Sequence, residues 1–214
     1  MNFTLISFQL TIFVELNIEN AKAIAKSFDD NYERAALPTI SMPNAPWFRI
    51  IAKNQSMNID ISNNRIDFFY REFKNEKINQ FVEFIDKNGD LIGKISRIAL
   101  NFSSFVQDIK DEYKTKLNRF FKFYDVYGDS EELLFRINSR KQIDSLLFNI
   151  ITNCQSGTVQ NSQTLESIKC IIFHYDINNV SVDKIDKDNL LNYFTKMSKE
   201  LSILKEKNER ILVE

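Results

Sequence analysis

His174 is the only histidine in the chain and the side chain best suited to acid–base chemistry near neutral pH. The residues around it alternate between apolar and polar, so a strand would place His174 on one face with Cys170 and Asp176. These residue types could supply a nucleophile, a base and an orienting carboxylate. Cys170 and His174 would still lie about 13 Å apart along a strand, too far for thiol–imidazole contact. We therefore predict a structural histidine, and keep an enzyme with a site near His174 and Asp176 as the third class of function.

Other signatures of catalysis or cofactor binding are missing from the sequence. The chain has 2 cysteines and no CxxC or HExxH motif, so it lacks the clustered ligands of a typical metal site. With 4 glycines it contains neither a P-loop nor a GxGxxG motif, the loops that bind phosphate groups. We expect no catalytic residue, no metal and no cofactor. We also expect Cys154 and Cys170 to be buried free thiols.

Three arginines are the leading candidates for a binding surface. Arg49, Arg97 and Arg136 each alternate with apolar neighbours, which predicts that each projects from a strand. We expect them on a sheet face that no helix covers, where they would contact a partner. The alternative is that these side chains lie over apolar neighbours on the surface of the sheet. We expect the same face to carry the aromatic residues Phe13, Phe73 and Tyr175.

A segment over 29–46 holds all 3 prolines and is predicted to be irregular. Long irregular segments inside a compact domain are uncommon and are often functional. Tyr32, Arg34 and Met42 give this segment an aromatic and apolar content that a simple linker would lack. We expect it either to pack over the core or to present an interaction edge.

The C-terminal segment over 187–212 has the most regular pattern in the chain. Its apolar seam follows alternating spacings of four and three residues: Leu190, Phe194, Met197, Leu201, Leu204, Asn208 and Ile211. Such spacing is typical of a two-stranded coiled coil, in which a single Asn can fix the register. The same stripe would also serve a helix that packs on its own sheet. A homodimer through this helix and packing within the chain both remain open, and the part after Lys205 would be the first to protrude.

The remaining elements suggest that one layout occurs twice. The first half is predicted as a strand over 5–16, a helix over 18–28, strands over 47–53, 57–61 and 65–73, and a helix over 77–87. The second half is predicted as a strand over 92–102, a helix over 105–123, strands over 132–139, 143–154 and 165–177, and the C-terminal helix. We predict an α+β fold in which a duplicated unit, 1–90 and 91–214, forms a mainly antiparallel sheet with helices on one face.

The second half opens on Arg97-Ile98-Ala99-Leu100-Asn101. This segment resembles an Arg–aliphatic–Gly–Leu pattern ending near an Asn, with Ala99 in place of the glycine. That pattern begins the second half of a sporadically distributed family of uncharacterised bacterial α+β proteins from variable genomic regions. The doubled layout is also similar to the saddle of the TATA-binding protein, although no DNA-kinking Phe pair can be placed here. The family resemblance implies a fold and a mobile-element or defence setting, with no activity to carry over.

Composition limits the classes of function. The chain has 214 residues, is 43% hydrophobic and has a net charge of -1, which argues against disorder and against a strongly basic nucleic-acid coat. No stretch approaches 18 apolar residues and the first strand is unlike a secretory signal, so we expect a cytoplasmic protein with no membrane contact. We predict a non-catalytic binding protein, a regulator or inhibitor of another protein, of a mobile-element, phage or defence type. The alternative is a nucleic-acid-binding protein that uses the open sheet face.

Overall fold

The computed structural model describes residues 3–35, 45–108, 110–120, 133–160, 165–180, 182 and 184–213. Its strands are β1 (Thr4–Val14), β2 (Tyr32–Ala35), β3 (Phe48–Ala52), β4 (Met57–Ile61), β5 (Arg65–Tyr70), β6 (Ile95–Gln107), β7 (Leu134–Ile143), β8 (Leu146–Gln160) and β9 (Ser167–Asn179). Its helices are α1 (Ile18–Lys26), α2 (Asn75–Lys87), α3 (Gly89–Ile92), α4 (Glu112–Phe120) and α6 (Leu190–Val213), with a 3-10 turn, η1 (Lys187–Asn189), before α6.

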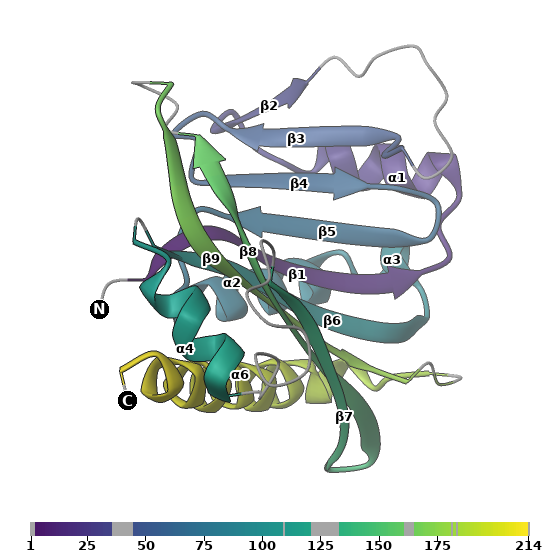
Figure 1. Ribbon diagram of the computed structural model, residues 1–214. Helices are drawn as coiled ribbons and strands as arrows, with labels where there is room; N and C mark the ends of the chain where they lie inside the picture. The colour runs from purple at the N-terminus through teal and green to yellow at the C-terminus, as the bar shows by residue number, and fades with distance from the viewer. Residues whose placement is uncertain are drawn as a thin grey trace.

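The strands form one antiparallel sheet, so the α+β class is confirmed. Among the described residues the sheet has nine strands in the order β2-β3-β4-β5-β1-β6-β9-β8-β7. The central pair is β1 and β6, which begin the two halves, and the remaining strands of each half lie on their own side of that pair (Figure 1). This order is compatible with two related units, although no described strand of the second half corresponds to β2. The duplication itself stays a prediction.

Alternation along the strands produces two different faces. Phe8, Leu10 and Ile12 of β1 are completely buried on the face covered by helices. Figure 1 shows α1, α2 and α3 behind the strands of the first half. On the same side, Phe194 of α6 contacts Phe81 of α2 with ring centroids 5.1 Å apart. Helices whose apolar stripes share one core can cover only one face of the sheet, and the other face is left for polar side chains.

One predicted helix boundary was wrong. The segment over 105–123 was expected to be helical, but β6 continues to Gln107, and Phe105 pairs with Ile172 of β9. The buried carboxylate of Asp108 then accepts hydrogen bonds from the backbone N–H groups of Tyr113 (2.8 Å) and Lys114 (2.9 Å). These bonds satisfy donors in the first turn of α4, so the helix begins only after Asp108.

Two other expectations also changed, one for the turn between β7 and β8 and one for the segment over 29–46. The β7–β8 turn lies at Asp144 and Ser145, and not between the predicted strands over 132–139 and 143–154, so Arg140 and Lys141 belong to a strand. The segment over 29–46 is not wholly irregular, because β2 pairs with β3 at the edge of the sheet. Cross-strand pairing with β3 provides the partner that the sequence pattern of this segment did not reveal.

The seam of α6 packs within the chain. Leu190, Phe194, Met197 and Leu201 are fully buried in the core, and Leu204 and Ile211 pack against it. Leu212, after Lys205, is also fully buried, and its carbonyl accepts a hydrogen bond from Lys116 Nζ at 2.9 Å. A homodimer through these same residues would therefore require α6 to leave its own core. Within the described ranges, no helix is long and apolar enough to cross a membrane.

Candidate functional site

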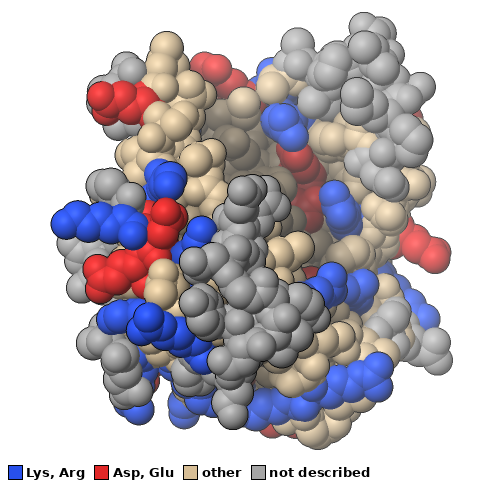
Figure 2. Space-filling view, viewed as in Figure 1, with Lys and Arg blue, Asp and Glu red and all other residues tan. Residues whose placement is uncertain are grey.

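The side of the sheet that no described helix covers carries many polar side chains. One cross-strand row crosses eight strands: Arg49, Asp60, Asp67, Thr11, Ala99, Asn178, Asn149 and Arg140. We call the surface formed by this row and its neighbours on the same side the polar face. Those neighbours are Gln9, Phe13, Arg65, Arg97, Ser103, Arg136, Asn153, His174 and Asp176. Figure 2 shows that this side is hollowed in the middle and bears both positive and negative side chains.

In the first half of the polar face, arginines are paired with carboxylates. Arg49 donates two hydrogen bonds of 2.6 Å to the two carboxylate oxygens of Asp60, and this pairing raises the pKa of Arg49. Arg65 forms an ion pair with Asp67 at 2.8 Å. Asp67 is 2% exposed and also accepts hydrogen bonds from Thr11 (2.7 Å) and Gln9 (2.9 Å). Each of these carboxylates is therefore held in a fixed position.

Arg97 lies at the centre of the polar face in a different environment. Its guanidinium carbon lies 4.9 Å from the ring centroid of Phe13, and its Nη2 donates to Asn178 Oδ1 at 2.7 Å. Asn178 in turn donates to Asp176 Oδ1 at 2.7 Å. The Nε atom of Arg97 is buried and has no hydrogen-bond acceptor among the described residues. The guanidinium group of Arg97 is thus partly buried and contacts the ring of Phe13 and the neutral amide of Asn178.

His174 has a partner that the sequence pattern did not reveal. Ser103 Oγ of β6 lies 2.6 Å from His174 Nδ1, a contact between residues 71 positions apart. Burial lowers the pKa of His174, and the charge of Asp176 opposes that shift. A hydroxyl in contact with a neutral imidazole is a possible nucleophile and base. The alternation of polar residues in 101–103 could have predicted that Ser103 lies on the polar side of a strand, but only strand pairing brings Ser103 to His174.

Within the described part of the chain, this pair has neither an orienting carboxylate nor a contact with Cys170. The Oδ1 atom of Asp176 is engaged by Asn178, and no hydrogen bond links Asp176 to His174 among the described residues. Cys170 is buried and its Sγ donates to the Gly157 carbonyl at 3.6 Å, so it does not contact His174. The chemistry that this geometry supports directly is hydrogen bonding to a ligand.

The structure separates the predicted binding residues into two groups. Arg49, Arg97 and Arg136 share the polar face, where Arg136 of β7 is exposed and opposes Asn153. Tyr32 and Arg34 lie on the helix-covered side, because the Tyr32 ring packs 5.0 Å from Phe28 and Arg34 donates to the carbonyl of Ala25. Met42 lies outside the described residues.

The placement of two aromatic residues was wrong. Tyr175 is 1% exposed and pairs with Phe102, so it belongs to the helix-covered core. Phe73 also packs there, with its ring 4.9 Å from Phe8 and 5.5 Å from Phe102. Tyr175 follows His174 directly, so it must point to the opposite face of the strand. Phe13 does lie on the polar face, beside Arg97.

The cysteines are buried and free, as predicted. Burial raises the pKa of both thiols, which keeps them protonated and unreactive near neutral pH. In the part of the chain that the structure describes, no group of three or more His, Cys, Asp or Glu side chains could hold a metal ion.

Comparison with known proteins gives no relative from which a role could be transferred: no family model and no curated protein matches this chain.

Proposed function

We propose that this protein is a non-catalytic binding protein that regulates or inhibits another protein, and that the polar face receives the partner. The observation that carries the proposal is the environment of Arg97. This side chain is fixed by Phe13 and Asn178, yet its buried Nε has no acceptor in the described part of the chain. A buried donor without an acceptor costs about 1–3 kcal/mol, and an acceptor on a partner would remove that cost once the Arg97 side chain shifts to expose Nε.

An acidic group on the partner fits Arg97 best. The same face pairs Arg49 with Asp60 and Arg65 with Asp67, whereas among the described residues Arg97 has only a neutral amide as its hydrogen-bond acceptor. A carboxylate can accept two parallel hydrogen bonds from a guanidinium group, and such pairs are stronger than neutral ones. We therefore infer that an Asp, a Glu or the C-terminal carboxylate of the partner binds Arg97.

The polar face extends across both halves of the chain. Phe13 of β1 is directly opposite Arg97 of β6 in the central pair of strands. We infer that the halves derive from a duplicated unit, since joining two such units through β1 and β6 creates a continuous surface. The buried free thiols are compatible with action in the cytoplasm, where thiols stay reduced. The composition, rich in Asn, Lys, Ile and Phe, is compatible with an AT-rich mobile element or phage as its source.

Nucleic acid is the second candidate partner, because several cations project from the polar face. They are Arg49, Arg65, Arg97, Arg136 and Arg140. Three carboxylates on the same face, Asp60, Asp67 and Asp176, oppose phosphate binding by repulsion. A surface with interleaved charges of both signs suits a protein partner better than a uniformly negative backbone.

The test begins with a partner captured on the native protein from its own cells and then purified. We expect Arg97→Gln to weaken its binding at least tenfold with little change in melting temperature. Arg49→Glu and Arg136→Glu should weaken binding less, since Arg49 is already paired and Arg136 lies at the edge. Arg210→Gln on α6 is the matched control, because its charge is exposed and pairs only with Glu206 in the described structure.

Two results would argue against this proposal. If all three polar-face variants bind like the parent protein, the interface lies elsewhere. If affinity falls steeply between about 50 and 200 mM salt and nuclease abolishes capture, the partner is a nucleic acid.

A further inference from the structure

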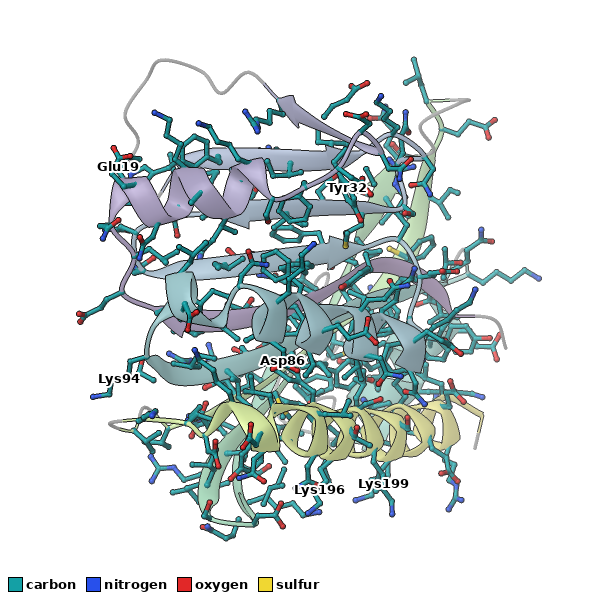
Figure 3. All side chains as sticks on the ribbon, turned by 180° about the vertical axis from the view of Figure 1, so that it is seen from behind. Glu19, Tyr32, Asp86, Lys94, Lys196 and Lys199 are labelled. Atoms are coloured by element: carbon teal, nitrogen blue, oxygen red, sulfur yellow. The ribbon has the colours of Figure 1, made fainter. Side chains whose placement is uncertain are left out.

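A second candidate site lies on the opposite, helix-covered side of the sheet. A cleft of about 510 Å³ lies between the end of α1, one side of α2 and strands β4 and β5. We call it the aromatic cleft. Its aromatic lining consists of Phe28, Tyr32, Phe68, Tyr70 and Phe84. Figure 3, turned by 180° from Figure 1, shows this side of the sheet, with Tyr32 labelled beyond the end of α1 and Asp86 labelled on α2. This volume falls within the range of pockets that bind small molecules.

The rings of the aromatic cleft hold one another in place. Phe28 stacks on Phe84 with centroids 5.3 Å apart, and Tyr32 meets Phe28 edge-on at 5.0 Å. Phe84 also meets Phe68 of the sheet at 4.8 Å. Phe28, Tyr32 and Phe84 are only partly buried, so ring surface remains available to a ligand. Aromatic walls fixed in this way favour a flat apolar group.

Charged groups of both signs line the same cleft. Lys77 and Lys87 supply positive charge, and Asp29 and Glu83 supply negative charge. Within the described structure, neither Glu83 nor Lys87 has an ion pair within 4.0 Å, although both lie on α2 beside Phe84. Lys77 lies 5.8 Å from the Tyr70 ring centroid and 3.6 Å from Glu72. The cleft is thus lined by two positive and two negative side chains, which suits a ligand that carries one charge of each sign.

We propose that the aromatic cleft binds a free aromatic amino acid. Its ring would pack against Phe28, Tyr32 and Phe84, its ammonium group would bind Glu83 or Asp29, and its carboxylate would bind Lys87 or Lys77. A purely anionic or purely cationic ligand would pair with one set of side chains and be repelled by the other. This site is independent of the polar face, because the sheet separates the two.

The proposal is tested by isothermal titration calorimetry of the full chain with L-phenylalanine. Three comparators each remove one recognised feature: N-acetyl-L-phenylalanine lacks the ammonium, L-phenylalaninamide lacks the carboxylate and L-leucine lacks the ring. We expect N-acetyl-L-phenylalanine and L-phenylalaninamide to bind at least tenfold more weakly than L-phenylalanine, because each loses one charge-assisted hydrogen bond. We expect L-leucine to bind at least tenfold more weakly as well, because it cannot make the aromatic ring contacts.

Variants then assign each charge. Glu83→Gln should weaken L-phenylalanine about tenfold and should not weaken N-acetyl-L-phenylalanine, an anion that loses a repulsion. Lys87→Gln should weaken L-phenylalanine about tenfold and should not weaken L-phenylalaninamide, a cation that loses a repulsion. Asp86→Asn is the control, since this exposed residue of α2 does not line the cleft. No heat of binding at millimolar L-phenylalanine, or equal affinities for all four ligands, would overturn the proposal.

Discussion

Asn208 of α6 donates a hydrogen bond from Nδ2 to the hydroxyl of Tyr175 in β9 at 2.6 Å. Asn208 is the one polar member of the apolar seam, and a coiled-coil pattern would pair it with its mate in a second copy. Here its partner is a buried tyrosine of the same chain. This bond fixes where α6 lies along the sheet, in the way that a buried polar residue fixes register in a coiled coil.

Removing this bond should destabilise the fold. We expect Asn208→Ala to lower the free energy of unfolding by about 1–3 kcal/mol, because the buried hydroxyl of Tyr175 loses the donor that it accepts from. The loss should be smaller when Asn208→Ala is made in a Tyr175→Phe background. Urea denaturation measures both, with Lys207→Ala as the surface control. Equal losses in the two backgrounds would show that the bond contributes nothing.

The seam should not support a dimer. We expect light scattering at tens of micromolar to give the mass of one chain, because the seam is buried within that chain. A chain truncated after Leu204 should melt at a lower temperature, since it loses Asn208, Ile211 and Leu212. A dimeric parent that becomes a stable monomer on truncation would show that the end of α6 joins two copies.

Asp67 should be the polar-face residue most important for stability. It accepts hydrogen bonds from Thr11 and Gln9, pairs with Arg65 and is almost fully buried. We expect Asp67→Asn to lower the free energy of unfolding by about 2–4 kcal/mol, because an amide replaces one acceptor oxygen with a donor. The exposed Asp86→Asn should change it by less than about 0.5 kcal/mol. A similar small change for Asp67→Asn would mean that this network does not stabilise the sheet.

His174 should make the fold less stable in acid. Burial lowers its pKa in the folded chain below the ordinary value of 6.5. Above pH 6.5 the imidazole is neutral in both states, and as the pH falls the unfolded chain binds the proton first, so stability is lost. We expect the melting temperature to fall more between pH 7.5 and 5.5 for the parent than for His174→Gln. Equal falls would show that other groups cause the acid sensitivity.

The Ser103–His174 pair should not act as a hydrolase. The imidazole has no hydrogen bond to a carboxylate among the described residues, and a nucleophile also needs an oriented base. We expect the parent and Ser103→Ala to release p-nitrophenol from p-nitrophenyl acetate at the same rate. A burst that is present in the parent and lost in Ser103→Ala would instead support the enzyme hypothesis.

The sequence by itself determined most of the local structure. Alternation identified β1, β4 and β9, and the four-and-three spacing identified α6, because side chains repeat every two residues in a strand and every 3.6 in a helix. Alternation also placed His174 and Asp176 on one face, with Tyr175 on the other. Burial of both cysteines was predicted because free Cys is among the most often buried residue types.

The tertiary structure decided which of these faces meet. The α6 seam has the same spacing whether it packs on its own sheet or on a second copy, and only the sheet order places Tyr175 opposite Asn208. Strand pairing likewise brings Ser103 to His174 and Phe13 to Arg97. Such contacts join residues far apart in the chain, and local periodicity does not specify which strands become neighbours.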